Sequence, residues 1–354
     1  MSSIDNIKRV RLRNFTVFRK LDFRASPGLN VLIGENGTGK SHLLKVLYAS
    51  LRQGPEGPTA GATKDEIRAA LRTSLMEVFR PDRLSRLVTR QRGAANAEIK
   101  VTFSARPKDR TLEYKFSTRQ KVPIVLSSIT PEVSTVFLPP HEVMSFFPGF
   151  VHAWEKRELE FDATHYDLCR ALSGAPLKRG PRDPGVQALV EALEQQLGAK
   201  VRVVDGRFYV RSVDGDIEAH LVAEGLRKLA TVMYLILNGT LSGSSVVFWD
   251  EPEANLNPRY VSVVAGMLNA LAKAGVQVFL ATHDYLLSEK LSLAAENDPS
   301  AGARFHSLRR GDDGVQIESA NTLAELDYNP ILDEFAKHYD EELAAVSKIE
   351  TEDE

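Results

Sequence analysis

Apolar residues recur at two different intervals near the start of the chain. In residues 8–15 ("KRVRLRNF") polar and apolar side chains alternate, and residues 28–34 ("GLNVLIG") form a short, mostly apolar run. The alternation is typical of a half-buried strand, and the continuous run is typical of a strand buried on both faces. Residues 41–53 ("SHLLKVLYASLRQ") have the three-and-four spacing of a helix. We therefore expect a strand, a glycine-rich loop and a helix in that order.

The last third of the chain alternates regularly between helix and strand patterns. A helix is expected over 225–239, a strand at 244–250, a helix from 257, a strand at 276–282 and a further helix after Asp284. This succession of strand, helix and strand predicts a mostly parallel sheet with helices on its faces.

The middle of the chain has both patterns, interrupted by glycine and proline. Residues 52–63 are rich in both and predict a loop, after which Thr63 can cap a helix over 64–79. From Pro139 to about residue 200 the helical pattern is broken repeatedly, which excludes a long coiled coil. Strands are expected at 97–103, 111–117 and 134–138, and a hairpin with Asp-Gly turns at 200–222.

Composition and charge narrow the class of protein. The 354 residues are 43% apolar and 26% charged, which is ordinary for a globular chain, and the net charge of -2 does not by itself indicate nucleic acid. The single cysteine, Cys169, cannot form an internal disulfide, so we expect a reducing compartment. The apolar run from Leu229 is too short to span a bilayer, and the N-terminus lacks the apolar run of a signal peptide. We expect a cytoplasmic protein with no membrane partner.

The run "GENGTGKSH", residues 34–42, has the spacing of a phosphate-binding loop. Its glycines let successive backbone N–H groups turn toward phosphate oxygens. Lys40 is expected to reach the β- and γ-phosphates and Ser41 to bind Mg²⁺. The alternative is a glycine-rich turn with a surface lysine. The candidate ATP-binding residues are Gly34, Asn36, Gly37, Thr38, Gly39, Lys40, Ser41 and His42.

Two carboxylates follow an apolar run in "VVFWDEPEANLNP", residues 246–258. Asp250 would end a strand beside the glycine loop, where it can hold Mg²⁺ together with Ser41. Glu251 can accept a proton from an attacking water. The alternative is a pair of surface carboxylates that cap a turn before Pro252.

Two further positions at the ends of elements carry candidate chemistry. His283 closes the strand in "VFLATHD", where it can hydrogen-bond a γ-phosphate or the attacking water; the alternative is a satisfied core histidine. Gly225 lies at the expected start of a helix, with Glu224 before it as a candidate cap. A glycine there lets the helix N-terminus approach a phosphate closely; the alternative is a plain helix start.

The order of these features resembles the ABC-type ATPase domain. The runs "GENGTGKS" and "DEPEANLNP" and the opening "VRLRNFTVFRKLDF" are similar to its soluble branch, the SMC/RecF-like ATPases and the ATPase portions of OLD-family and related phage-defence AAA-type proteins. The resemblance covers roughly residues 5–50 and 220–290. It implies an α/β fold: a P-loop NTPase with an ABC-type head domain, whose mixed sheet is flanked by helices and carries a helical and β insertion.

The resemblance also implies a role for each matching residue. Lys40 and Ser41 match the Walker A lysine and magnesium hydroxyl. Asp250 matches the Walker B aspartate, Glu251 the catalytic glutamate and His283 the switch histidine. ATP and Mg²⁺ are the cofactors that this set implies.

The signature region departs from the family pattern. Gly225, with Glu224 before it, matches the signature glycine, which in this family contacts the γ-phosphate of a neighbouring subunit, so that ATP lies between two head domains. Here "AEGLRK" replaces the usual signature run, and Asn257 replaces the aspartate of the D-loop run "ANLN". No clear Q-loop glutamine is present. Glu142 or His141 is the candidate substitute, with a plain Pro-Pro turn as the alternative.

The matches divide the chain into three parts. Residues 1–51 and 215–320 form the expected ATPase core, and residues 52–214 form an insertion of strands and a helical lid. Residues 321–354 form a C-terminal helical segment with an acidic tail.

Three functions fit these features. The leading one is an ATP-hydrolysing switch that forms a homodimer or larger homo-oligomer around ATP and acts, through a separate effector protein, in bacterial anti-phage defence or DNA processing. The alternative is a RecF-like DNA-binding repair clamp. For it, Arg83, Arg86 and Arg90 on one expected helix face are candidate nucleic-acid contacts, and a solvated helix face is the other interpretation. An ABC transporter ATP-binding subunit is less favoured, because the insertion is longer than in such subunits.

Overall fold

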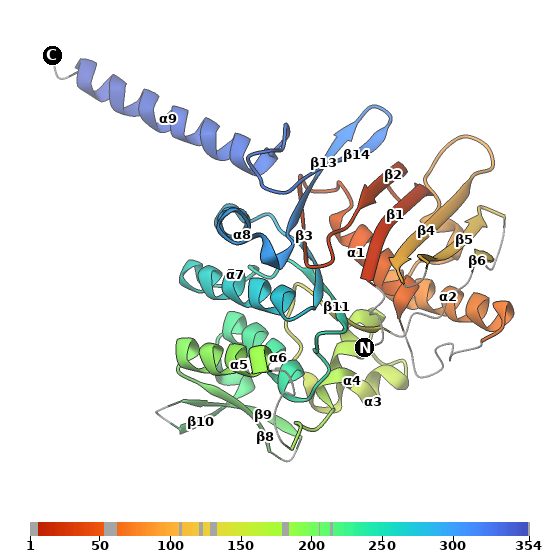
Figure 1. The fold of residues 1–354 in the computed structure, drawn as a ribbon, viewed down its shortest axis with the longest axis horizontal. Coiled ribbons are helices and arrows are strands. Elements are labelled where there is room, and N and C mark those ends of the chain that lie inside the picture. Colours follow the sequence, from red (N-terminus) through yellow and green to blue (C-terminus); the bar gives the residue numbers. More distant parts are fainter. Residues whose placement is uncertain are drawn as a thin grey trace.

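Two β-sheets lie on either side of helix α1 (Lys40–Leu51), and further helices cover the outer side of the larger sheet (Figure 1). This arrangement comes from a computed structural model of the chain. It describes residues 6–52, 62–105, 108–119, 123–127, 133–178, 184–204, 206–212 and 215–352.

The larger sheet has six strands in the order β14-β13-β3-β12-β11-β7. They are β3 (Leu29–Gly34), β7 (Ser134–Leu138), β11 (Ser245–Asp250), β12 (Gln277–Ala281), β13 (Arg304–Gly311) and β14 (Gly314–Ala320). Neighbouring strands pair in parallel, except that β14 runs antiparallel to β13. Parallel strands bring their carboxyl ends to one edge of a sheet, where α/β proteins bind ligands. Gly34, Asp250 and Ala281 are the last residues of β3, β11 and β12 and therefore lie at the same edge.

A large apolar core lies on the side of this sheet away from α1. Val247 and Trp249 of β11 belong to it, whereas Val246 and Phe248 face α1. Because β11 is covered on both faces, its sequence is the continuous apolar run typical of a buried parallel strand. Buried Cys169 lies in the same core. The helices that contribute to it are α3 (Phe147–Glu155), α4 (Ala163–Leu172), α5 (Pro184–Leu197), α6 (Glu224–Leu237), α7 (Pro258–Lys273) and α8 (Tyr285–Asn297).

The smaller sheet has five antiparallel strands in the order β2-β1-β4-β5-β6. They are β1 (Asn6–Phe15), β2 (Phe18–Arg24), β4 (Asn96–Ser104), β5 (Arg110–Ser117) and β6 (Ile124–Ser127). Its apolar face packs on α1 and on α2 (Lys64–Phe79). β4 and β5, like β7 of the larger sheet, come from the predicted insertion 52–214. Both sheets therefore run across the predicted domain boundary.

Helix α2 begins and ends where local chemistry requires. Thr63 and Glu66 form a capping box, in which each side chain accepts a hydrogen bond from the other residue's backbone N–H. The predicted cap is thus confirmed. The helix ends at Phe79, because Arg80 adopts a left-handed conformation (φ 48°) and Pro81 cannot continue the hydrogen-bond ladder.

The predicted arginine-bearing helix after Pro81 is wrong. Only Leu84–Leu87 form a short 3-10 turn there, held by the buried side chains at its two ends. Val88 then pairs with Phe15 in an isolated β-bridge. Proline interrupts the helix before the arginine spacing can place them on one face. The exposed arginines concerned are Arg83, Arg86 and Arg90.

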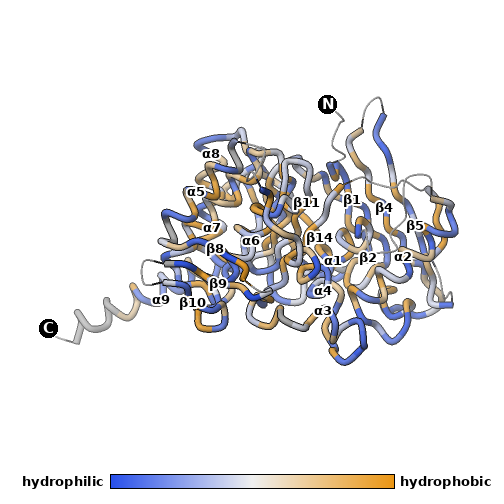
Figure 2. The backbone as a smooth tube through the Cα atoms, turned by 90° about the horizontal axis from the view of Figure 1, so that it is seen from below, coloured by the Kyte–Doolittle hydropathy of each residue, from blue (hydrophilic) through white to orange (hydrophobic). Residues whose placement is uncertain are grey.

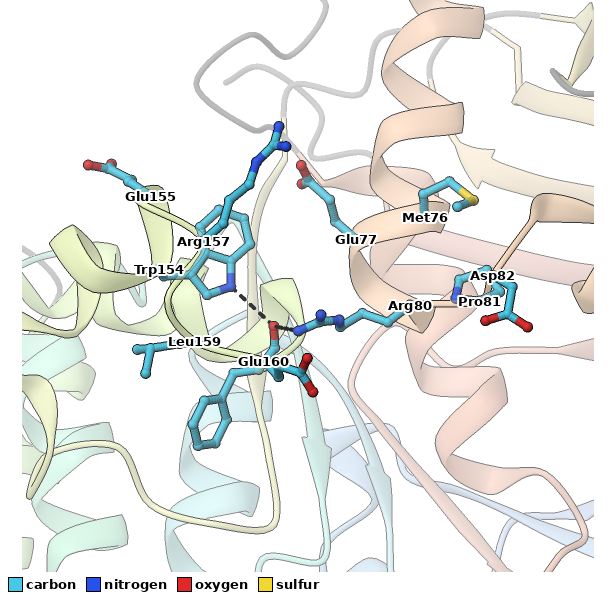
Figure 3. Close-up of a pocket in the computed structure, with 11 residues that line it drawn as sticks. Met76, Glu77, Arg80, Pro81, Asp82, Trp154, Glu155, Arg157, Leu159 and Glu160 are labelled. Carbon is cyan, nitrogen blue, oxygen red and sulfur yellow. Dashed lines mark hydrogen bonds between the residues drawn. The ribbon is translucent and has the colours of Figure 1, made fainter.

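Arg80 fastens the end of α2 to the segment that follows α3. Its Nη1 donates a hydrogen bond to the Phe161 carbonyl at 2.9 Å, and the Trp154 indole donates to the same oxygen at 3.1 Å (Figure 3). A hollow of about 670 Å³ lies beside this contact. The Arg80 guanidinium therefore makes a contact within the chain.

The remaining elements lie at the periphery. β8 (Lys200–Val204), β9 (Arg207–Ser212) and β10 (Gly215–Glu218) form a three-stranded antiparallel sheet where a hairpin was predicted. Residues 205 and 213–214 of its predicted turns, and residues 53–61 of the predicted glycine- and proline-rich loop, lie outside the described residues. Helix α9 (Pro330–Glu352) projects from the body in both views (Figures 1 and 2). Within the described ranges, no helix is both long and apolar enough to cross a membrane.

Candidate nucleotide-binding site

The phosphate loop joins β3 to α1 at the carboxyl edge of the larger sheet. Gly34 has φ 145°, and a Cβ there would lie 2.5 Å from the Leu308 carbonyl oxygen. Gly39 has φ 94°, and a Cβ there would lie 2.6 Å from Cγ2 of Val17. Contacts this close are not tolerated, so both positions require glycine for backbone conformation and for space. The loop is therefore packed on β13 at one end and on the turn after β1 at the other.

Lys40 is the first residue of α1 and is 5% exposed. Its Nζ donates hydrogen bonds to the carbonyl oxygens of Gly34 at 2.6 Å and Glu35 at 3.1 Å. Burial lowers the pKa of Lys40 to about 8, and the nearby carboxylates of Asp250 and Glu251 oppose that shift. The ammonium group thus lies across the inside of the loop and is mostly charged at neutral pH.

Ser41 and Asp250 meet as the sequence predicts. The Ser41 hydroxyl donates to Oδ1 of Asp250 at 3.1 Å. Burial raises the pKa of Asp250, and the Ser41 hydrogen bond opposes that effect. A hydroxyl and a carboxylate are ligands that Mg²⁺ accepts, and it takes its remaining ligands from phosphates and water. The described part of the chain has no group of three or more His, Cys, Asp or Glu side chains placed to hold a metal.

Glu251 and His283 face each other at the mouth of the site. Oε1 of Glu251 lies 3.3 Å from Nε2 of His283, and each side chain is 37% exposed. Glu251 adopts a left-handed backbone conformation (φ 49°), and its N–H donates to the Ala281 carbonyl at 2.9 Å. Such strain is uncommon for a residue with a side chain and is found at functional sites. Burial and the charge of Lys40 lower the pKa of His283, so its ring is neutral at pH 7.

Glu253 contributes to the site but was not singled out from the sequence. Its Oε1 accepts hydrogen bonds from the Thr282 hydroxyl at 2.7 Å and from the His283 N–H at 3.0 Å. Burial raises the pKa of Glu253. The carboxylate therefore fastens the segment after β11 to the end of β12 and holds the His283 backbone in place. Glu253 lies in the run "DEPEANLNP", but the sequence of that run does not distinguish a carboxylate of the site from one exposed to solvent.

Lys228 is a second contributor without a sequence signal. It is 5% exposed on α6, and its Nζ donates to the Ala254 carbonyl at 2.6 Å. Gly225, one turn earlier, is buried against the same segment: a Cβ there would lie 2.7 Å from Cδ1 of Leu256. The N-terminus of α6 is therefore packed on residues 255–256 of its own chain, within the predicted D-loop. This gives Gly225 a reason to be glycine within one subunit; its predicted contact with a neighbouring subunit stays a prediction.

Asn257 has a local role that fits its departure from the family pattern. Its side chain caps α7 by accepting a hydrogen bond from the Arg259 N–H at 3.0 Å. Asparagine and aspartate cap helices about equally well, so the substitution preserves the start of α7.

The other candidate residues lie around this centre. Glu142 is buried, forms an ion pair with Nε of Arg227 on α6 at 2.7 Å, and accepts a hydrogen bond from the Ser145 N–H. It thus connects the segment after β7 to α6, and its Q-loop role stays a prediction. The His42 ring packs against Phe79 with centroids 5.8 Å apart. His42 therefore contacts α2, and its predicted contact with nucleotide is likewise open to test.

The family comparison covers most of the site. The model of a family described as "AAA domain, putative AbiEii toxin, Type IV TA system" matches residues 29–289. That range begins with β3 and ends within α8, so it contains the phosphate loop, the Asp250–Glu251 pair and His283.

Two curated relatives are both named "DNA replication and repair protein RecF". The one from Desulforamulus reducens is 28% identical over 201 residues, which are 55% of this chain and 50% of the relative. The one from Streptococcus uberis is 48% identical over 42 residues, 12% of each chain. The chain spans about half the length of the first relative and about an eighth of the second.

Solved structures of SMC head domains share the fold. An SMC head bound to the C-winged helix domain of ScpA has a TM-score of 0.57 at 13% identity, covering 90% of this chain and 99% of the other. The head domain derived from Pyrococcus yayanosii, with a coiled coil and joint, has a TM-score of 0.56 at 9% identity, covering 89% and 97%. At such identities the likeness concerns the fold alone. The prediction of an α/β P-loop head of the ABC type is confirmed.

Proposed function

The chain belongs to the family described as "AAA domain, putative AbiEii toxin, Type IV TA system", and on this premise we propose that it is an ATP-hydrolysing switch. Two copies close on ATP and Mg²⁺, and closure is passed to a separate effector protein in anti-phage defence or DNA processing. The observation that carries the proposal is the pairing of Glu251 with His283 beside the Lys40 loop and the Ser41–Asp250 pair.

In this proposal each side chain has a distinct task. The Lys40 ammonium and the loop N–H groups hold phosphate oxygens. Ser41 and Asp250 would hold Mg²⁺, which would neutralise phosphate charge when bound. Glu251 accepts the proton of the attacking water, and neutral His283 orients that water or the γ-phosphate through Nε2. Glu253 keeps His283 in position through its backbone.

Exposure of the reacting side chains supports a dimer. The side chains of Glu251 and His283 are each 37% exposed, so the predicted base is partly open to solvent within one subunit. Electrostatic stabilisation of the transferred phosphoryl group is stronger where water is excluded. A second copy that presents Glu224 and the α6 N-terminus would cover this side and complete the site.

Mixing two impaired variants tests the shared site. Lys40→Ala lacks a working phosphate loop, and Glu224→Arg places a bulky cation at the α6 N-terminus. Each alone is expected to hydrolyse ATP slowly. Together they form mixed dimers in which the loop of one chain meets the intact α6 of the other, so hydrolysis rises above the sum of the separate rates. We chose Glu224 because substitution of Gly225 would also disturb Leu256 within the chain.

The same experiment has a physical readout besides the rate. Wild-type chain with ATP and Mg²⁺ is expected to double its mass in light scattering. A mixture that stays inactive, with a wild-type chain that keeps its mass on adding ATP, contradicts the shared site.

A second candidate function, ATP-dependent DNA binding, is favoured by the open face of the smaller sheet. Seven basic side chains lie on this face against three carboxylates. The cations are Arg9, Arg11, Arg13, Lys20, Arg24, Lys100 and Lys115, and the carboxylates are Asp22, Glu98 and Glu113. Asp22 already pairs with Arg9 and Arg11, and Glu113 pairs with Lys100. An excess of positive charge remains for phosphates.

The segment that carries the exposed Arg90 lies next to the end of this sheet. The Thr89 N–H donates to the Asn14 carbonyl at 2.9 Å, and the Thr16 N–H donates to the Leu87 carbonyl at 2.8 Å. These bonds lay the segment that carries Arg90 along the end of β1. The two named RecF relatives add a reason to test DNA.

Neutralising the sheet face tests DNA binding. Arg13→Gln, Lys20→Gln and Arg24→Gln together are expected to weaken duplex binding and to lower the slope of log affinity against log salt by about 0.9 per lost phosphate contact. Arg202→Gln with Arg207→Gln, on the separate three-stranded sheet, serves as the control. Equal salt slopes in the two variants would remove this face as a DNA contact.

A further inference from the structure

Helix α9 begins beside the phosphate loop. Tyr328, two residues before it, donates a hydrogen bond from its hydroxyl to Oε1 of Glu35 at 2.8 Å. The Arg309 guanidinium lies over the Tyr328 ring, 4.9 Å from its centroid, and Arg310 donates to the Gly37 carbonyl at 3.4 Å. Burial and the bond to Glu35 raise the pKa of Tyr328 to about 12, so the phenol remains a donor. A movement of the phosphate loop would therefore displace the residues that begin α9.

The second turn of α9 makes a further contact with the body of the molecule. The Phe335 ring stacks on Tyr285, with centroids 4.4 Å apart and an interplanar angle of 28°. Tyr285 is the first residue of α8 and lies two residues after His283. The base of α9 thus touches both the phosphate loop and the segment that follows the switch histidine.

Beyond that base, α9 leaves the body of the molecule (Figures 1 and 2). Leu332, Phe335 and Tyr339 are 42%, 52% and 60% exposed, and Leu343, also exposed, continues their spacing. Intervals of three and four residues place them on one face of a helix. A single helix projecting into water gains little stability from its own turns, so this apolar stripe fits a surface that a second molecule covers.

The charges on α9 indicate the kind of molecule. Residues 330–345 carry five carboxylates and one lysine, which are Asp333, Glu334, Asp340, Glu341, Glu342 and Lys337. At 100° per residue, Asp340 and Glu342 flank the apolar stripe on its two sides. Two copies of α9 packed along this stripe would bring like charges together, which disfavours such pairing. A groove with an apolar floor and a basic rim complements the stripe instead.

We propose that α9 is the docking helix for a second protein that offers such a groove, and that Tyr328 couples docking to the state of the phosphate loop. The proposal rests on the proposed function in one respect: the second protein is the separate effector on which the switch acts. It concerns a surface outside the nucleotide site, so it can fail independently.

Purification from the organism that encodes the chain tests docking. Full-length tagged protein is compared with the variant Leu332→Asp, Tyr339→Asp and with the control Glu341→Gln on the opposite side of α9. One protein is expected in stoichiometric amount with the wild type and the control, and to be lost from the stripe variant. Produced separately, that protein should rebind the wild type with an affinity that falls as salt rises.

Two results overturn the docking proposal. One is a partner retained by the stripe variant. The other is the absence of any stoichiometric partner, including the case in which the stripe substitutions alter the mass of the purified chain because a second copy covers the stripe. ATP turnover separates this outcome from the proposed function: a wild type that does not hydrolyse ATP refutes the ATPase proposal, whereas an active chain without the partner refutes the docking helix alone.

Hydrogen exchange tests the coupling. ATP is expected to change amide exchange over residues 329–335 in the wild type, and Tyr328→Phe, which lacks the hydroxyl bound to Glu35, is expected to lose that change. Tyr339→Phe, on the projecting part of the same helix, should retain it. An equal response of all three proteins would remove Tyr328 as the coupling residue.

Discussion

Glu251→Gln binds ATP but hydrolyses it ~10²- to ~10⁴-fold more slowly than the wild type, the range that a general base contributes. The amide keeps the size of the carboxylate, so the loop and the Ser41–Asp250 pair stay intact. It cannot accept a proton from water, and its contact with Nε2 of His283 loses charge. Nucleotide is therefore retained, and closed dimers accumulate. Single-turnover hydrolysis, ATP affinity and light scattering on one preparation measure the three effects.

Glu253→Gln is the matched control for Glu251→Gln, because the two glutamates lie two residues apart in the same segment. Its amide oxygen can still accept the hydrogen bonds from Thr282 and the His283 N–H, so a much smaller loss of rate is expected. A Glu251→Gln enzyme that hydrolyses ATP at the wild-type rate would end the assignment of Glu251 as the base.

The parts of the site that are contiguous in sequence could be predicted. The strand, loop and helix around Lys40 form one uninterrupted run, and Asp250 is the last residue of a strand that is buried on both faces. Their chemistry is local: the order of residue types fixes the backbone turn and the direction of the side chains. The meeting of Ser41 with Asp250 then follows from the rule that parallel strands end at one edge.

The contacts that the sequence did not predict join distant positions. Tyr328 and Glu35 are 293 positions apart, and β4, one of the two strands that pair with β1, lies inside the predicted insertion. Lys228 has helical surroundings in the sequence, and only the fold places its ammonium against the Ala254 carbonyl. The prediction of a helix that carries the arginines was wrong for a local reason: α2 ends before Pro81, so the arginines that follow are not on a helix.

Replacing Lys40 is expected to weaken nucleotide binding. In Lys40→Met the ammonium that spans the loop is lost, and the Gly34 and Glu35 carbonyl oxygens lose their shared donor. A hydrogen bond to a charged group contributes about 1.5–3 kcal/mol, so ATP affinity should fall by ~10- to ~100-fold. Calorimetric titration with ATP measures this affinity. The control is Lys45→Met, which removes another lysine of α1, one that pairs with Asp162. This variant should keep the wild-type affinity.

The pH dependence of ATP affinity distinguishes this role from a structural one. The Lys40 pKa of about 8 belongs to the free protein, and bound phosphate favours the charged form and raises it. Between the two values binding takes up a proton, so affinity falls by up to ~10-fold per pH unit above pH 8. His283, whose imidazole pKa is lowered from its ordinary value, does not titrate there. Lys40→Met should therefore lose the alkaline decline as well as affinity. If it binds weakly yet keeps that decline, another group carries the proton and Lys40 does not contact the phosphates.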